Sequence, residues 1–248
     1  MKAMVLAAGK GTRLGELTRD LPKPMLEVAG QPILGHILLH LARHGFREVV
    51  INLHHQAQAI QDHFGDGSRW GARITYIREP ELLGTAGSVR NASACFADPA
   101  EPFLVQYGDV ITDQDLTAMT AAHRARGALA SLLLHRRARS NSIVQLGPDQ
   151  RVLRLLERPT ESEREQVAGE VWVNSGVYLL QPAVLASIPA RGPADFPRDV
   201  FPALIPRGLV FGWPLTGYRC AIDSPERLEQ ARADLARGLA AGPCHPPT

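Results

Sequence analysis

The stretch MVLAAGKGTRLGEL (residues 4–17) decides the fold class of this chain. A short apolar run at residues 4–8, typical of a buried strand, stops at a turn with two glycines, a lysine and an arginine. Glycine lets backbone N–H groups approach an anion closely, and arginine can bind two phosphate oxygens at once. The stretch therefore predicts a strand followed by a phosphate-binding turn. The alternative is an ordinary strand-to-helix turn with an exposed arginine.

Two familiar phosphate motifs do not fit this turn. A dinucleotide fingerprint needs a third glycine at the position of Leu14. A Walker A loop needs Ser or Thr directly after Gly-Lys, but Gly11 follows Lys10. Further on, LPKPM (residues 21–25) frames Lys23 with two prolines, which restrict the backbone on both sides. Such a stiff segment indicates a positioned cation.

Beyond the turn, strands and helices alternate. We expect helices at residues 32–44, 56–64, 87–96 and 115–127, and strands at 48–53, 73–78 and 102–107. This order predicts an α/β fold that is Rossmann-like, with a mostly parallel mixed sheet and helices on both faces. Later strands are expected at residues 129–135, 142–146, 152–157, 171–180 and within 209–223, before a last helix at 225–239.

Composition narrows the function classes. With 248 residues and a net charge of +2, the chain has no basic field for nucleic acid, and no apolar run long enough to span a bilayer. The N-terminus has no cleavable signal pattern, and the three scattered cysteines form neither a metal spacing nor a disulfide framework. We therefore expect a cytoplasmic protein with neither nucleic acid nor membrane as a partner.

Taken in order along the chain, several motifs resemble those of the sugar-1-phosphate nucleotidylyltransferases. AAGKGTRL (7–14) and LPKPM are similar to the opening signature of that family, LLGTAGSV (82–89) to its base- and ribose-binding loop, and YGDV (107–110) to its strand-end aspartate. LERP (156–159), VNSGVYLL (173–180), DFPRDVFP (195–202) and IDSPERL (222–228) fall where the family has similar segments. The resemblance points toward the mannose- and heptose-phosphate guanylyltransferases, and it implies a nucleotidyltransferase fold of the glycosyltransferase-A-like type.

The implied reaction joins a sugar 1-phosphate to a nucleoside triphosphate (NTP) and releases pyrophosphate. Two polyanions repel each other, so the reaction needs positioned cations. The resemblance implies that Arg13 and Lys23 are these catalytic cations. The residues implied in nucleotide binding are Leu6, Ala8, Gly9, Gly11, Thr12, Arg13, Lys23, Glu79, Gly84, Thr85, Ala86 and Gly108. Those implied in sugar-phosphate binding are Gly108, Glu157, Arg158, Asn174 and Gly176. For Asn174 and Gly176, the alternative is a plain strand with one buried, satisfied asparagine.

Mg²⁺ is the implied cofactor, with Asp109 and Asp223 as its ligands. Asp109 ends a strand, where open α/β sheets bind their ligands, although a cap or turn residue is the alternative. Asp223 departs from the family pattern, because Ala221 occupies the usual aspartate position. Residues 221 and 223 point to the same face of a strand, so Asp223 can serve instead. The alternative is that Asp223 caps the helix that begins at Pro225.

Glu79 bears on the choice of base. A carboxylate only accepts hydrogen bonds; guanine offers two adjacent donors, whereas uracil and thymine offer one donor flanked by acceptors. A Glu79 that faces the base therefore favours GTP, as does the resemblance to guanylyltransferases. The alternative is that Glu79 or Glu81 is a solvated charge.

The expected organisation is one domain over residues 1–240, with a nucleotide-binding half at 1–128 and a sugar-phosphate-binding half at 129–240, followed by a disordered tail at 241–248. A homodimer is compatible with the sequence. Two other functions stay open. One is a non-catalytic, nucleotide-sugar-binding regulatory subunit, kept open by Ala221 and by Arg158, which replaces the family's lysine. The other is a uridylyl-, thymidylyl- or cytidylyltransferase for another phosphate, such as a cyclitol phosphate.

Overall fold

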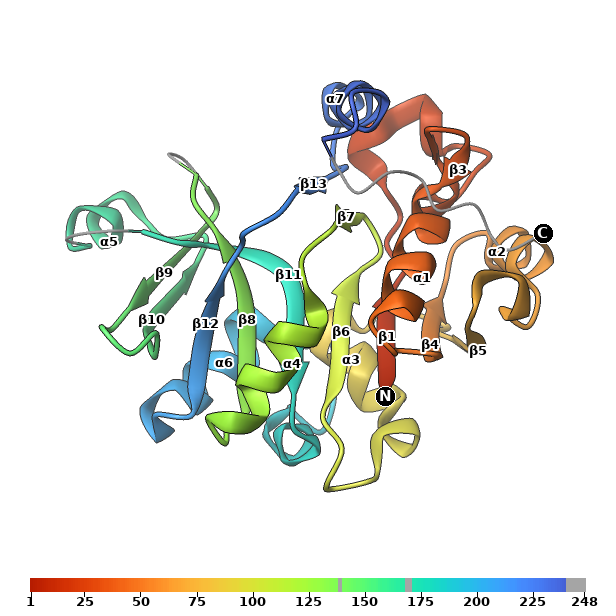
Figure 1. Cartoon of the computed structure of the whole chain (residues 1–248). Helices are drawn as coiled ribbons and strands as arrows, with labels where there is room; N and C mark the ends of the chain where they lie inside the picture. The colour runs from red at the N-terminus through yellow and green to blue at the C-terminus, as the bar shows by residue number, and fades with distance from the viewer. Residues whose placement is uncertain (138–139, 168–170, 240–248) are drawn as a thin grey trace. The chain divides into compact units, whose positions relative to one another are not determined.

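The structure is a computed structural model, and it describes residues 1–137, 140–167 and 171–239 (Figure 1). The predicted tail at 241–248 lies outside the described residues. The chain forms two compact units. Unit 1 consists of Met1–Leu82, Leu104–Thr117 and the chain from Thr216 onward, and unit 2 of Leu83–Phe103 and Ala118–Leu215.

Unit 1 contains parallel strands in the order β6-β1-β4-β5. These are β1 (Lys2–Leu6), β4 (Glu48–Leu53), β5 (Arg73–Arg78) and β6 (Phe103–Tyr107). The helices are α1 (Ile33–Arg43), α2 (Ala57–Phe64) and α7 (Pro225–Ala236). Residues 3–5 of β1 are completely buried, as expected for an apolar strand with parallel neighbours on both sides.

Two short antiparallel ladders complete unit 1. β2 (Glu27–Val28) pairs with β3 (Gln31–Pro32), and β7 (Val110–Thr112) pairs with β13 (Arg219–Ala221). Next to the second ladder, the backbone N–H of Ile222 donates to the carbonyl oxygen of Asp109 at 2.9 Å. This ladder brings the segment of Asp223 beside the segment of Asp109.

Unit 2 is built around β8 (Ala130–His135), which pairs antiparallel with β11 (Val173–Leu180) and parallel with β12 (Val210–Pro214). β9 (Ser142–Leu146) and β10 (Val152–Glu157) form an antiparallel pair. The helices are α3 (Gly84–Asn91), α4 (Leu116–Ala125, of which unit 2 contains Ala118 onward), α5 (Glu161–Glu165) and α6 (Phe201–Leu204). Buried rings of Tyr178, Phe196 and Phe201 pack with centroids 5.0–5.6 Å apart in the core.

The predicted α/β class with a mostly parallel mixed sheet is confirmed. The helix expected at residues 87–96 is shifted, because α3 starts at Gly84 and gives way to a 3₁₀ turn at Ser93–Phe96. The short helices α5 and α6 were not predicted, since neither is long enough to show a helical period. Among the described residues, no helix combines the length and apolarity needed to cross a bilayer.

Candidate active site

The glycine turn after β1 is shaped by Gly11, whose φ is 65°. A Cβ on Gly11 would lie 3.1 Å from the Thr18 side chain and 3.2 Å from Cβ of Lys23. The Thr18 hydroxyl in turn donates to the carbonyl oxygen of Gly11 at 3.1 Å. A side chain at position 11 would therefore be strained twice, by its backbone conformation and by crowding. The turn is held next to Lys23, as a phosphate site would require.

Gly108 closes the end of β6 against the end of β1. Its N–H donates to the carbonyl oxygen of Leu6 at 2.9 Å, and a Cβ would lie 2.7 Å from that oxygen. This close approach explains why position 108 needs a residue without a Cβ. Its role in binding either substrate stays a prediction.

The four charged residues predicted for catalysis and metal binding form two ion pairs in unit 1. Lys23 Nζ lies 2.5 Å from Asp109 Oδ2, with side chains only 12% and 26% exposed. Arg13 Nη1 lies 3.2 Å from Asp223 Oδ2, with side chains 74% and 38% exposed. The structure therefore brings each predicted cation to one of the predicted carboxylates. The first pair is shielded from solvent and the second is not.

Arg219 is a third cation near these carboxylates, and it is not among the site residues predicted from the sequence. Burial lowers the pKa of its guanidinium, while the negative charges of Asp109 and Asp223 act in the opposite direction. A signal was present in the sequence, because Arg219, Ala221 and Asp223 alternate within the strand expected in 209–223 and would share a face there, although β13 itself ends at Ala221.

Asp223 does not cap helix α7, so that alternative is wrong. The N-cap is Ser224, whose Oγ accepts a hydrogen bond from the N–H of Arg227 at 3.3 Å. Ser224 has the extended backbone of a cap residue, with φ −149° and ψ 165°. The Asp223 side chain pairs with Arg13 instead, and its role as a metal ligand stays a prediction.

The donor set suits a magnesium ion completed by phosphate oxygens. Mg²⁺ is usually held by one or two carboxylates together with substrate phosphates and water. Among the described residues, Asp109 and Asp223 each use one oxygen in their ion pairs, so each has a second oxygen for a metal. No group of three or more His, Cys, Asp or Glu side chains in that part of the chain could hold a metal by itself.

Glu79 is a buried carboxylate at the end of β5. Its side chain is 3% exposed, and Oε1 accepts a hydrogen bond from Nδ2 of Asn52 at 2.9 Å. Its Oε2 is buried without a hydrogen-bond partner among the described residues. The alternative of a solvated charge is therefore wrong for Glu79, although Glu81 is exposed.

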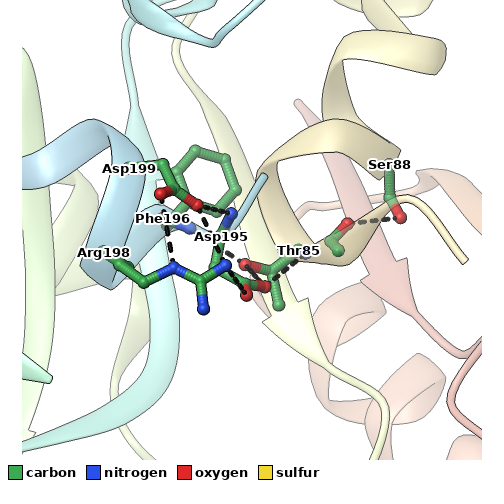
Figure 2. A network of polar contacts seen from close by, with 7 residues as sticks. Thr85, Ser88, Asp195, Phe196, Arg198 and Asp199 are labelled. Carbon is green, nitrogen blue, oxygen red and sulfur yellow. Dashed lines mark hydrogen bonds and ion pairs between the residues drawn. The ribbon is translucent and has the colours of Figure 1, made fainter. Parts of the chain in front are cut away.

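In unit 2, Asp195 holds the start of helix α3 (Figure 2). Its Oδ1 accepts from both the N–H and the hydroxyl of Thr85, at 2.9 and 3.1 Å. The N–H of Phe196 donates back to Thr85 Oγ1 at 3.0 Å. Arg198 contacts Asp195 Oδ2 at 3.2 Å and Asp199 Oδ1 at 3.3 Å, which orients the Asp195 carboxylate. Thr85, a predicted nucleotide-binding residue, is thus fixed by a segment 110 residues away.

The next N–H groups of the same helix are also occupied. The carbonyl oxygen of Ala194 accepts from Ala86 at 2.8 Å and from Gly87 at 3.0 Å. Gly84 has φ 73°, and a Cβ there would lie 2.5 Å from that oxygen. Because these donors are already used, the start of α3 is not a phosphate cradle. Packing of this loop against a nucleoside stays a prediction.

Four of the residues predicted for the sugar phosphate lie in unit 2. Glu157 ends β10, Arg158 follows it, and Asn174 and Gly176 lie on β11. Burial raises the pKa of the Glu157 carboxyl, Arg158 opposes this shift, and Asp195 adds to it. Arg158 has a left-handed backbone with φ 53°. The Asn174 side chain donates to the Tyr178 hydroxyl at 2.7 Å and accepts from the Gly176 N–H at 3.0 Å. Asn174 is thus satisfied within its own strand, although it is half-buried and not buried as the plain-strand alternative expects. Its ligand role stays a prediction.

Comparison with known proteins adds an independent finding. The sequence profile of the family described as nucleotidyl transferase matches residues 2–212. The N-acetylmuramate alpha-1-phosphate uridylyltransferase of Neisseria meningitidis is 37% identical over 237 residues, which cover 94% of this chain and 97% of that protein. The mannose-1-phosphate guanylyltransferase of Mycobacterium tuberculosis is 34% identical over 97% of this chain, but the match spans 66% of its own length. The UTP--glucose-1-phosphate uridylyltransferase of Synechocystis sp. is 33% identical, and the match covers 85% of this chain and 57% of that protein.

Solved structures share the fold. A putative glucose-1-phosphate thymidylyltransferase from Bacillus anthracis superposes with a TM-score of 0.82 over 94% of both chains, at 20% identity. HddC from Yersinia pseudotuberculosis, complexed with GMP-PN, superposes with a TM-score of 0.77 over 94% of this chain and 98% of its own, at 22% identity. At such identities the likeness concerns the fold alone.

Proposed function

This chain belongs to the nucleotidyl transferase family, and on that premise we propose that it joins a sugar 1-phosphate to a nucleoside triphosphate with release of pyrophosphate. The observation that carries this proposal is that Lys23 pairs with Asp109 and Arg13 with Asp223 in unit 1, while the charge of Arg219 interacts with both carboxylates. Two polyanionic substrates repel each other, so their reaction needs fixed cations more than it needs covalent chemistry.

In the proposed reaction, an oxygen of the sugar phosphate attacks the α-phosphorus, and the bond to the β-phosphate oxygen breaks. Lys23 stabilises the charge that develops at the α-phosphate, and Arg13 binds the leaving pyrophosphate. Phosphate oxygens would replace the carboxylates as partners of these cations, which makes both oxygens of Asp109 and Asp223 accessible to Mg²⁺. When bound, Mg²⁺ neutralises part of the phosphate charge.

The sugar phosphate is proposed to bind through unit 2. Glu157 accepts hydrogen bonds from sugar hydroxyls, and Arg158 binds the phosphate, where its planar guanidinium differs in shape and reach from a lysine. The raised pKa of Glu157 limits this role at low pH, because a protonated carboxyl is a poorer acceptor.

GTP is the proposed nucleotide. The support is the buried Oε2 of Glu79, an acceptor that lacks a donor among the described residues and suits the two adjacent donors of guanine. The name of the Mycobacterium tuberculosis relative agrees with this choice. UTP is the second candidate, because the Neisseria meningitidis relative that matches along 97% of its length is named a uridylyltransferase.

A direct assay tests the proposal. Purified protein is given Mg²⁺, one of GTP, UTP, dTTP, CTP or ATP, and one of a panel of sugar 1-phosphates that includes mannose, glucose and N-acetylmuramate. Pyrophosphate release is then measured. We expect the highest kcat/KM with GTP. A preference for UTP would keep the reaction class and reject guanine, whereas nucleotide binding without pyrophosphate release would favour the non-catalytic regulatory alternative.

A further inference from the structure

We propose that Asn52 is a positioning residue that sets the choice of base, because it fixes which oxygen of Glu79 is offered to a ligand. The inference rests on the proposed function, since it assumes that Glu79 meets the base. It concerns a side chain that none of the sequence motifs includes.

Asn52 and Glu79 lie on neighbouring parallel strands of unit 1. Asn52 belongs to β4, and Glu79 directly follows β5, whose Arg78 is in register with Leu53. Both side chains are almost fully buried, at 2% and 3% exposure. Polar side chains buried to this degree are expected to be held by hydrogen bonds, so each contact has a defined direction.

The orientation of the Asn52 amide follows from its neighbours. The backbone N–H of Ala7 donates to Oδ1 of Asn52 at 2.8 Å, so this end of the amide must be the oxygen. Nδ2 then points toward Glu79 and donates to Oε1 at 2.9 Å. Ala7 stands between Leu6 and Ala8, which are both predicted to bind the nucleotide. The amide therefore connects the glycine turn to Glu79.

The main chain of Glu79 is fixed as well. The N–H of Glu79 donates to the carbonyl oxygen of Leu53 at 2.8 Å. The carbonyl oxygen of Glu79 lies 2.9 Å from Nδ1 of His54. With the backbone and Oε1 both held, only Oε2 is left to interact with something else. A buried acceptor without a donor is costly, and a ligand donor removes that cost.

Asn52 can only donate toward position 79, so residue 79 must turn an acceptor toward it. The second polar atom of residue 79 is then what the base meets. In the native protein that atom is a carboxylate oxygen, which accepts. In E79Q the new amide would turn its carbonyl oxygen to Asn52 and offer its NH₂ group, which donates and opposes the donors of guanine.

A double substitution reverses this polarity. In N52D/E79Q, the carboxylate introduced at position 52 keeps the hydrogen bond from Ala7 with one oxygen. Its other oxygen accepts from the NH₂ group of the amide introduced at position 79. That amide then offers its carbonyl oxygen where Oε2 of Glu79 was. The single variant E79Q should change the base preference, and the double variant should restore it.

The experiment measures kcat/KM for GTP and for UTP with one sugar 1-phosphate, together with the Kd of each nucleotide by calorimetry. We expect E79Q to lower the GTP/UTP ratio by about tenfold or more, and N52D/E79Q to recover most of that loss. N52A removes the hydrogen bond from Asn52 to Glu79 but keeps Glu79, and it should move the GTP/UTP ratio toward one. R73M is the matched control, because it removes the exposed ion pair between Arg73 and Glu48 on the same two strands, away from Glu79, and it should keep the wild-type ratio.

Ratios that are the same in all these variants would overturn the role of Asn52 even if the wild type is a GTP-specific enzyme. A wild type that prefers UTP would reject the guanine proposal alone, because the change in E79Q and its reversal in the double variant test Asn52 whichever base is preferred. A wild type that binds neither nucleotide overturns both. Thermal unfolding shows whether a variant is misfolded. If E79Q or N52D/E79Q is misfolded, the GTP/UTP ratio of N52A, which makes the smallest change, is compared with that of the wild type.

Discussion

The ammonium nitrogen of Lys23 lies 2.5 Å from Oδ2 of Asp109, although 86 residues separate them. Lys23 begins a short 3₁₀ turn, Lys23–Met25, framed by Pro22 and Pro24, and Asp109 lies between strands β6 and β7. Two stiff segments of the backbone therefore set the contact. Such a pair suits the proposed reaction, since a phosphate can replace the carboxylate while the lysine stays in place.

Replacement of Lys23 should impair chemistry more than binding. We expect K23M to lower kcat by about a hundred- to a thousandfold, because a positioned charge beside the α-phosphate acts mainly in the transition state. The Kd for the nucleotide should change far less. R73M, which removes the exposed Arg73–Glu48 ion pair of the same unit, is the control and should leave kcat unchanged. Equal losses in kcat and in binding would contradict a transition-state role for Lys23.

Asp223 and Ser224 are adjacent but should have separable roles. We expect D223N to raise the Mg²⁺ concentration needed for half-maximal rate, with little change in the free energy of unfolding, because its ion pair with Arg13 is exposed. S224A should cost about 1 kcal/mol of stability by removing the cap of α7, with an unchanged Mg²⁺ requirement. Urea unfolding and a Mg²⁺ titration measure the two effects. A Mg²⁺ requirement that moves equally in both variants would argue against Asp223 as a ligand.

Two glycines with the same backbone conformation allow a clean test of crowding at α3. Gly84 and Gly192 have φ values of 73° and 72°, but a Cβ would meet the Ala194 carbonyl oxygen at 2.5 Å only at Gly84. G192A should cost about 1 kcal/mol for its left-handed backbone. G84A should cost about 1–3 kcal/mol more, because the helix start must move. Urea unfolding of both variants checks this. Equal losses would show that α3 shifts without penalty.

Acidification should destabilise the protein through buried histidines. Burial lowers the pKa of His123 from 6.5 to about 4, and its Nδ1 lies 2.9 Å from Ser131 Oγ. The unfolded chain takes up the proton first, so the free energy of unfolding should fall as pH drops from 6.5 to about 4. The loss is up to roughly 3 kcal/mol for this group, at about 1.4 kcal/mol per pH unit.

H123Q removes this titration and should make the pH dependence shallower. It should not abolish it, because burial also lowers the pKa of His40, to about 3, with the same sign. L153A, which changes an exposed side chain that takes up no proton, is the control and should keep the wild-type slope. Urea unfolding at pH values from 7 down to about 4 gives the slopes. A slope that is identical in H123Q and in the wild type would contradict a buried neutral His123.

The capping of α7 shows where local pattern stops being sufficient. Asp223 and Ser224 are both favoured N-cap residues, and both stand shortly before the first helical residue, Pro225. Only the backbone course decides between them, and the β7–β13 ladder sets that course by pairing Ala221 with Val110. The start of α3 is a similar case, since its caps are supplied by Ala194 and Asp195 from another part of the chain.

The sequence by itself determined the α/β class, the alternation of strands and helices along the first half of the chain, the glycine turn after the first strand and the stiff setting of Lys23. These features rest on apolar periodicity and on the dihedral limits of glycine and proline, which act over a few neighbouring residues. Only the tertiary structure decided three other features. These are the burial of Glu79 against Asn52, the electrostatic interaction of Arg219 with Asp109 and Asp223, and the hydrogen bond from Thr85 to Asp195. Hydrogen bonds and charges act through space, and no local pattern tells which distant partner the fold brings within reach.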